Sequence, residues 1–512
     1  MSTAYRGIGA FRLRPHPHLF EINTWTWLEQ LSAQSGHATK LADVPDDKWD
    51  ALAKMGFNVI WLMGVWRRSA ESRRIMVEDP ANFPQFERAL PGWKPEDVIS
   101  SPYSVAEYFP DPRIGNWDSL DLVRDKLHAR GMALFLDFVG NHTALDHPWI
   151  SAHPEYYVQA GQQDYDRNPS LYYSSKTTKG TRFIALAKDP YFPPWKDVAQ
   201  LNYFDPALRT AQINELHTIA KHCDGVRCDM AMLQLSDIFA NGWRHLLGNT
   251  QAPANEFWAE AHAALPNLVL LAEAYWGTEQ RLLDLGFSFA YDKALYDAVR
   301  DIHVLQVRDR LRSDPRQQSH SARFMENHDE ARRPEVFGND RLISAGTLMG
   351  TLPGMRFYHQ GELEGRRIHL PITLRIAADE PLDPASLALF QKILEITKQD
   401  VFHDGEWNLL EVAAVGDVST EGLIVYEWRS ATAWKVIAVN ITADVSQGRV
   451  RFADRISASS QYDFHDELDD VHYARNGAEL CYVGFFIRRE GFQAHLFDVK
   501  AVPYCAVDGA GE

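Results

Sequence analysis

The segment ALFLDFVGNH, residues 133–142, decides the fold. Its first seven residues are apolar apart from Asp137, which is typical of a β-strand that is buried on both faces. The preceding residues place Leu120, Val123 and Leu127 on one face of a helix, and Gly131 then ends that helix. A helix followed by a short, fully apolar strand is the repeating unit of parallel α/β structure.

The same alternation of helices and strands extends along most of the chain. Eight strands are expected at residues 19–25, 57–62, 133–139, 224–231, 268–273, 287–291, 322–326 and 355–358, with helices between them that include 46–55, 118–130 and 206–222. This pattern favours an α/β fold of the (β/α)8 TIM-barrel type. A doubly wound sheet is the alternative, but no glycine-rich phosphate loop follows an early strand.

Two regions depart from the alternation and predict further domains. Residues 143–203 are rich in Tyr and Pro and lack periodicity, so we expect an inserted subdomain after the third strand. Beyond residue 405 the sequence contains short alternating strands without helices, which predicts a C-terminal antiparallel β-sandwich over 405–512. The barrel would then comprise residues 1–142 and 204–404.

Composition limits the partners and the compartment. The net charge of −17 argues against nucleic acid, whose phosphates need a basic surface. No apolar run is long enough to span a membrane, and residues 1–17 lack the apolar core of a signal peptide, so a cytoplasmic protein is expected. The four cysteines have no CxxC spacing and are expected to be reduced: Cys223, Cys228, Cys481 and Cys505.

Ionisable residues stand at the ends of several predicted strands. In a (β/α)8 barrel these carboxyl ends share one face, and charged groups there predict a polar cleft. Arg227 and Asp229 are two residues apart and point to the same side, so the guanidinium is expected to lower the pKa of Asp229. Glu273 follows the next strand, where neighbouring carboxylates and the apolar Tyr275–Trp276 pair are expected to raise its pKa. An anionic nucleophile facing a protonated acid is the arrangement for retaining glycoside cleavage.

Four ordered segments carry a resemblance to a known family. They are DFVGNH (137–142), GVRCDMA (225–231), LAE (271–273) and FMENHD (324–329), and together they resemble the signature regions of the α-amylase family, glycoside hydrolase family 13. The resemblance covers roughly residues 19–400. It implies that residues 143–203 correspond to domain B of that family and that the C-terminal β domain corresponds to its domain C.

The resemblance also assigns roles to individual residues. It implies Asp229 as nucleophile, Glu273 as acid/base and Asp329 as the group that grips the sugar hydroxyls. The remaining expected site residues are Arg227 orienting the nucleophile, His142 and His328 binding the sugar, Asp137 supporting the network and Tyr103 stacking on the sugar. Tyr103 and Asp137 each have an alternative reading as structural residues. No cofactor and no metal are expected, although Asn141 and Asp197 stand where some family members bind calcium.

The expected function is hydrolysis of α-glucosidic bonds in maltooligosaccharides or small α-glucosides. The alternative is a transglycosylase or phosphorylase that transfers glucosyl or maltosyl units to a sugar, phosphate or a small acceptor, because these enzymes share the glycosyl–enzyme intermediate. An inert amylase-like scaffold or transport accessory subunit is the third interpretation, and the presence of all three carboxylates argues against it.

Two departures from the family pattern affect the substrate. Met230 and Met232 stand where many α-amylases carry a basic pair, so polymeric starch is not favoured as the substrate. The segment 64–117 contains four arginines that are interpreted as a solvated charge run, with recognition of a phosphorylated sugar or an anionic acceptor as the alternative hypothesis: Arg67, Arg68, Arg73 and Arg74.

Overall fold

The computed structural model describes residues 5–6, 11–177, 180–452 and 455–502. Its centre is a closed barrel of eight strands that are all parallel, with β13 paired to β7 and β17 paired back to β3. The strands are β3 (His18–Asn23), β4 (Val59–Met63), β7 (Ala133–Phe138), β13 (Gly225–Cys228), β14 (Val269–Ala272), β15 (Phe289–Tyr291), β16 (Ser321–Arg323) and β17 (Met355–His359). The (β/α)8 prediction is confirmed, and the doubly wound alternative is excluded.

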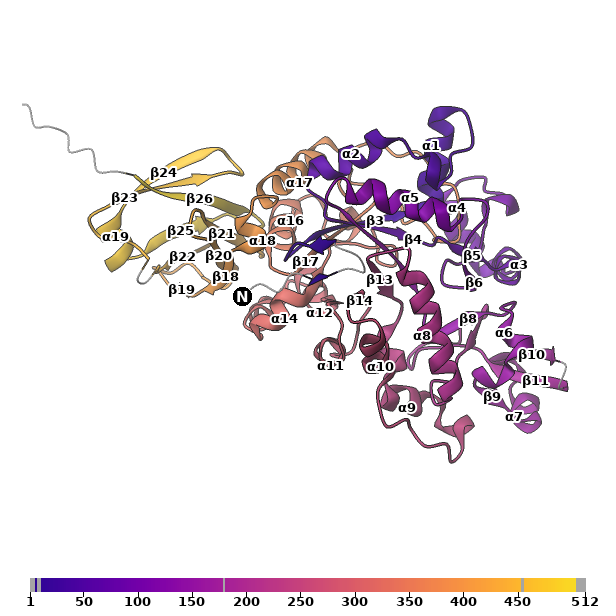
Figure 1. The fold of residues 1–512 in the computed structure, drawn as a ribbon. Coiled ribbons are helices and arrows are strands. Elements are labelled where there is room, and N and C mark those ends of the chain that lie inside the picture. The colour runs from indigo at the N-terminus through magenta and orange to yellow at the C-terminus, as the bar shows by residue number, and fades with distance from the viewer. Residues whose placement is uncertain (1–4, 7–10, 178–179, 453–454, 503–512) are drawn as a thin grey trace, which may run out of the picture.

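Helices surround this barrel, as Figure 1 shows. They include α1 (Thr24–Ser35), α2 (Asp46–Met55), α5 (Trp117–His128), α8 (Pro206–Ala220), α9 (Ser236–Leu247), α10 (Phe257–Ala264), α11 (Glu279–Asp284), α12 (Lys293–Arg300), α16 (Leu342–Thr351) and α17 (Pro384–Thr397). Gly56 ends α2 with a φ of 96°, a left-handed conformation that glycine adopts without a steric penalty. The first strand is shorter than expected, because Asn23 caps α1 and the helix starts at Thr24.

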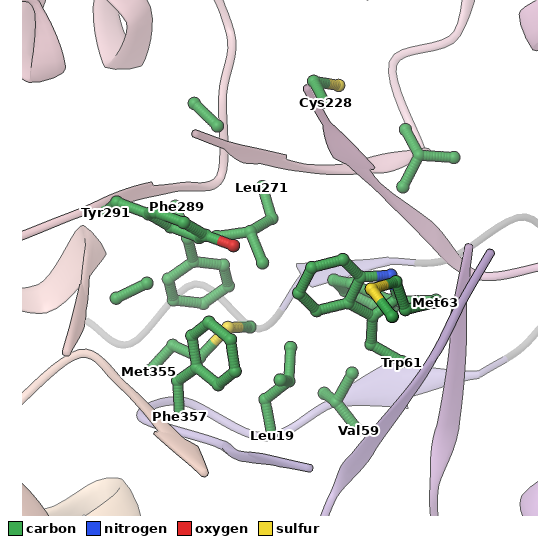
Figure 2. Packing of buried hydrophobic residues seen from close by; sticks show 14 of the residues in the cluster. Leu19, Val59, Trp61, Met63, Cys228, Leu271, Phe289, Tyr291, Met355 and Phe357 are labelled. Atoms are coloured by element: carbon green, nitrogen blue, oxygen red, sulfur yellow. The ribbon is translucent and has the colours of Figure 1, made fainter. Parts of the chain in front are cut away.

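The interior of the barrel is filled by large apolar side chains from successive strands (Figure 2). Trp61, Phe289 and Leu19 have no exposed surface. Gly225 permits the close contact of β13 with its neighbours, because a Cβ there would lie 2.5 Å from the Phe135 ring and 2.8 Å from the carbonyl oxygen of Val269. The core therefore fixes how the strand ends meet at the mouth of the barrel.

The two largest groups of strands outside the barrel lie at opposite ends of the molecule in Figure 1. After β7, the chain forms β8 (His142–Ala144), β9 (Gln159–Ala160), β10 (Tyr172–Thr177), β11 (Gly180–Ala185) and β12 (Val198–Gln200), with short helices α6 (Trp149–Ala152) and α7 (Gln162–Arg167). These strands form a three-stranded sheet, β10-β11-β9, and the β12-β8 pair.

The C-terminal part contains two antiparallel sheets. One has the order β18-β20-β21-β26-β23-β24 and the other β19-β22-β25. Their bounds are β18 (Glu406–Leu410), β19 (Val412–Ala413), β20 (Leu423–Arg429), β21 (Trp434–Asn440), β22 (Ser446–Val450), β23 (Gln461–Asp466), β24 (Val471–Asn476), β25 (Phe485–Arg489) and β26 (Ala494–Val502). The domain packs against the barrel through β20, where the Trp428 Nε1–H donates to the carbonyl oxygen of Thr351 at 2.7 Å.

The described cysteines Cys223, Cys228 and Cys481 are free thiols, and Cys505 lies outside the described residues. Among the described residues, no helix combines the length and the apolar character that a membrane crossing requires.

Candidate active site

The carboxyl ends of the barrel strands bring three carboxylates from distant parts of the chain together. Asp229 follows the last residue of β13, Glu273 follows the last residue of β14, and Asp329 lies in the loop after β16. Arg227 lies within β13, in register with Asp137 on β7 and with Leu271 on β14. Parallel pairing therefore places these groups at one level of the barrel.

Arg227 connects the carboxylates. Its Nη1–H donates to Asp229 Oδ1 at 2.8 Å, and its Nη2 lies 2.8 Å from Glu273 Oε2 and 4.0 Å from Asp329 Oδ2. The guanidinium has no exposed surface and lies over the rings of Trp61 and Tyr103, at 5.4 Å and 5.1 Å from their centroids. One buried cation thus contacts the carboxyl groups of two neighbouring strands.

The proton affinities of Asp229 and Glu273 differ from the sequence prediction in one respect. Burial raises the pKa of Asp229 above its usual value, although Arg227 acts in the opposite direction. The expected lowering of this pKa was wrong, because the strand pattern revealed the guanidinium but not the burial of the carboxyl group. For Glu273 the prediction is confirmed: burial, reinforced by Asp229 and Asp329 and opposed by Arg227, raises the pKa to about 7.

Tyr275 was assigned a purely apolar role, and the structure corrects this. Its hydroxyl donates a hydrogen bond to Glu273 Oε1 at 2.8 Å, and the backbone N–H of Met230 donates to Glu273 Oε2 at 2.7 Å. Both donors stabilise the ionised carboxylate. Glu273 is therefore held in a fixed orientation while burial keeps its pKa high.

A second ionic group surrounds Asp329. Its Oδ2 lies 3.0 Å from His328 Nε2, and the Tyr103 hydroxyl lies 2.7 Å from the same nitrogen. The other ring nitrogen of His328 contacts the buried carboxylate of Glu21. Although burial disfavours the imidazolium, Asp329 and Glu21 hold the pKa of His328 well above its usual range. Desolvation raises the pKa of Asp329, but His328 and Arg227 outweigh this effect and lower the pKa to about 2.

The other expected site residues take supporting positions. The Tyr103 ring stacks on His328, with centroids 5.2 Å apart. His142 Nε2 lies 3.0 Å from the carbonyl oxygen of Tyr103, and burial lowers the pKa of His142 to about 4, so the ring is neutral. Asp137 has no exposed surface and accepts hydrogen bonds from the Trp61 Nε1–H at 3.1 Å and from the Gly64 N–H at 2.6 Å.

A cavity of about 750 Å³ opens above these carboxylates. Its lining contains Tyr103, His142, Asp229, Glu273 and Asp329. Further lining residues form an apolar wall, namely Met76, Phe192, Trp195, Met230 and Trp276. Phe192 and Trp276 expose 69% and 41% of their surface, which is unusual for large apolar side chains. Met232 is fully buried, so only the first of the two methionines faces the cavity.

The arginines of segment 64–117 do not line this cavity, and the hypothesis that they bind a phosphorylated sugar there is wrong. Arg67 pairs with Glu107 at 2.9 Å, and Arg74 pairs with Glu71 at 2.7 Å. The guanidinium groups of Arg68 and Arg73 donate to backbone carbonyl oxygens of the same segment. All four guanidinium groups therefore bind partners within the segment. The segment forms β5 (Trp66–Arg68), α3 (Ala70–Glu78), α4 (Phe83–Ala89) and β6 (Val105–Pro110).

The two candidate calcium-type residues have protein partners. The Ser72 hydroxyl donates to Asp197 Oδ2 at 2.6 Å, and the Gln200 side-chain N–H donates to Asn141 Oδ1 at 3.0 Å.

Sequence reasoning missed Glu21, although a signal was available. Glu21 lies inside the apolar strand β3, has no exposed surface and pairs with His328. A charged residue within an otherwise apolar strand is costly unless it has a partner, which is the same criterion that identified Arg227. Phe192 gave no comparable signal, because its role depends on how the inserted segment folds over the barrel.

Comparisons with known proteins identify the family to which the barrel belongs. The family model of the alpha-amylase catalytic domain matches residues 46–369. Alpha-amylase 3 of Dictyoglomus thermophilum is 26% identical over 290 residues, covering 51% of this chain and 53% of that protein. An oligo-1,6-glucosidase of Halalkalibacterium halodurans is 22% identical, covering 67% and 66%. The chain thus spans about half to two thirds of the length of these relatives.

A solved structure with the same fold is the maltogenic alpha-amylase AmyB from Thermotoga neapolitana. It superimposes with a TM-score of 0.67 at 18% identity and covers 94% of this chain and 98% of that one. Because the family model covers more than half of the chain and the barrel is closed with eight parallel strands, the protein belongs to the α-amylase family, glycoside hydrolase family 13.

Proposed function

We propose that this protein is a retaining α-glycoside hydrolase that acts on α-glucosidic bonds of maltooligosaccharides or small α-glucosides. The observation that carries the proposal is the contact of one buried guanidinium, Arg227, with both Asp229 and Glu273 beneath a cavity of about 750 Å³. Because the two carboxyl groups share one guanidinium at the mouth of the barrel, we infer double displacement, in which the carboxyl groups lie about 5–5.5 Å apart, rather than direct attack by water.

The geometry supports a division of roles. Asp229 attacks the anomeric carbon while Glu273, whose pKa is raised to about 7, protonates the departing glycosidic oxygen. The covalent ester with Asp229 is then hydrolysed by a water molecule that gives its proton to Glu273. Asp329, which lines the cavity, binds the hydroxyl groups of the sugar, and His328, which does not line it, orients the Asp329 carboxylate.

The apolar wall supports short substrates. Phe192, Trp276 and Met230 line the same cavity as Glu273, and such apolar surfaces pack against the apolar faces of sugar rings or against an apolar leaving group. A cavity of about 750 Å³ lies within the range of about 300–1,000 Å³ that is usual for small-molecule sites. These features favour small α-glucosides and short oligosaccharides over polymeric starch.

Transglycosylation is the second candidate, and the exposed wall favours it because the same surface can hold an acceptor sugar after the first product leaves. Phosphorolysis has less support. Lys293 is the sole lysine or arginine among the described residues that line the cavity, and its ammonium group already pairs with Asp297 at 2.6 Å and with Glu330 at 3.1 Å.

Product analysis tests the proposal. The enzyme is incubated with maltooligosaccharides, sucrose, trehalose and α-glucose 1-phosphate, with and without phosphate or glycerol, and the anomer formed first is identified by proton NMR. The α-anomer and free glucose or maltose are expected. A β-anomer as first product would contradict double displacement, and glucosyl-glycerol or glucose phosphate as main products would replace hydrolysis by transfer. Asp229→Asn is the control and is expected to be inactive.

A further inference from the structure

The hairpin of β23 and β24 in the C-terminal domain carries a cluster of histidines far from the barrel site. His465 and His472 lie directly opposite each other in the antiparallel register, and their rings stack with centroids 4.2 Å apart and planes at 7°. Asp470, in the turn between the strands, lies with its Oδ1 2.8 Å from His465 Nε2. Figure 1 shows this hairpin at the end of the molecule away from β9, β10 and β11.

We propose that His465, Asp470 and His472 form a binding site for a divalent transition metal ion, for which Zn²⁺ is the best fit. Imidazole nitrogens and a carboxylate oxygen are ligands that zinc takes in proteins. One ligand atom from each residue lies within 4.8 Å of the other two. In a tetrahedral zinc site two ligand atoms are about 3.3 Å apart, so these side chains close by about 1.5 Å at most.

The exposure of the cluster permits this closure. The side chains of Asp470 and His472 are 85% and 61% exposed, so both can rotate without disturbing the core. Side chains alternate between the two faces along β23: Phe464 is buried in the core, whereas His465 is on the outer face. Movement of the outer side chains therefore leaves the core packing unchanged. Three protein ligands leave the fourth position of the ion to water.

Asp463 strengthens the proposal because it orients one ligand. Its Oδ2 lies 2.8 Å from His472 Nδ1, and an ionised carboxylate can only accept this hydrogen bond. In the neutral imidazole Nδ1 therefore carries the proton, which leaves the Nε2 lone pair for a metal ion. A carboxylate behind a metal-binding imidazole is the usual means of fixing its tautomer, and its removal typically costs about 10–100-fold in affinity.

The neighbouring group of Asp466, Asp469 and His495 is a poorer candidate. Asp466 is fully buried, and its Oδ1 accepts hydrogen bonds from the backbone N–H groups of Leu468 at 3.2 Å and Leu496 at 3.1 Å. Its Oδ2 is in contact with His495 Nδ1. This carboxylate stabilises the turn, and binding an ion would remove hydrogen bonds from the interior.

Isothermal titration of the metal-free, full-length protein with ZnCl2 tests the site. The wild type is expected to bind Zn²⁺ saturably, and His472→Ala is expected to lose one equivalent. Asp463→Asn is expected to keep the equivalent with an affinity lower by about 10–100-fold. His37→Ala, which removes another exposed histidine, is the matched control and is expected to bind like the wild type.

Three results would overturn the proposal: a wild type without saturable zinc binding, a His472→Ala variant with unchanged stoichiometry, or loss of the equivalent in His495→Ala but not in His472→Ala. Thermal unfolding of each metal-free variant verifies the fold. If His472→Ala unfolds at a lower temperature than the wild type, the titration is repeated with His472→Gln, whose side chain keeps a polar end in the same place.

Discussion

Replacing Glu273 with glutamine removes the acidic proton but keeps the size and shape of the side chain. Glutamine has nearly the same volume, and its carbonyl oxygen can still accept from the N–H of Met230 or from the Tyr275 hydroxyl, which lie 2.7 Å and 2.8 Å from the present carboxylate oxygens. Arg227 keeps its hydrogen bond to Asp229. The variant is therefore expected to fold like the wild type while lacking a proton donor for the leaving group.

The pKa of about 7 sets the pH dependence of the wild type. The acid must carry its proton when the substrate binds, so activity is present below pH 7 and is lost as the pH rises through 7. Above this value kcat/KM falls about tenfold for each pH unit. Loss of a general acid lowers kcat by about 10²–10⁴-fold, which corresponds to about 3–5 kcal/mol in the barrier.

The assay compares two substrates over pH 4–9. With a maltooligosaccharide, Glu273→Gln is expected to lose the whole factor of about 10²–10⁴ in kcat. The decline of kcat/KM above pH 7 is expected to be absent, because the side chain that titrates there has been replaced. With α-glucosyl fluoride, whose fluoride leaves without a proton, the first burst of fluoride is expected to persist. Added azide, which attacks the glycosyl–enzyme without a base, is expected to restore turnover. An equal loss with both substrates, or a decline above pH 7 retained in the variant, would refute the assignment of Glu273.

Four other changes test separate parts of the structure. Asp229→Asn is expected to abolish the fluoride burst that Glu273→Gln keeps, and a persisting burst would exclude Asp229 as nucleophile. Arg227→Met is expected to move the acidic limb of the kcat/KM profile to higher pH, because the variant lacks the cation that favours the ionised form of Asp229. Arg227→Lys keeps a cation and is expected to move this limb less. Phe192→Ala is expected to raise KM for maltotetraose with little change in kcat for α-glucosyl fluoride; equal effects on both would refute its place beside the leaving group. Gly225→Ala is expected to lower the free energy of unfolding by about 1–3 kcal/mol in urea titrations, because its Cβ would meet the Phe135 ring at 2.5 Å, and an unchanged midpoint would contradict the packing described for β13.

The sequence predicted the barrel because its strands are short, apolar and separated by helices, and this pattern is local. A strand was expected at residues 355–358 and is observed as β17, Met355–His359, and a helix was expected at residues 46–55 and is observed as α2, Asp46–Met55. The spacing of Arg227 and Asp229 on one strand also placed both side chains on one face, because alternation along a strand has a period of two.

Tertiary structure alone decided the electrostatics and the lining of the cavity. The contact of Arg227 with Glu273 joins residues 46 positions apart in the chain, and the contact of His328 with Glu21 joins residues 307 positions apart. The pKa of Asp229 is raised because burial depends on everything that surrounds the carboxyl, whereas its sequence neighbours show only the nearby charge. The four arginines of segment 64–117 do not line the cavity, because they bind partners within their own segment. Their sequence pattern shows the charges but not which face of the segment is turned toward the barrel.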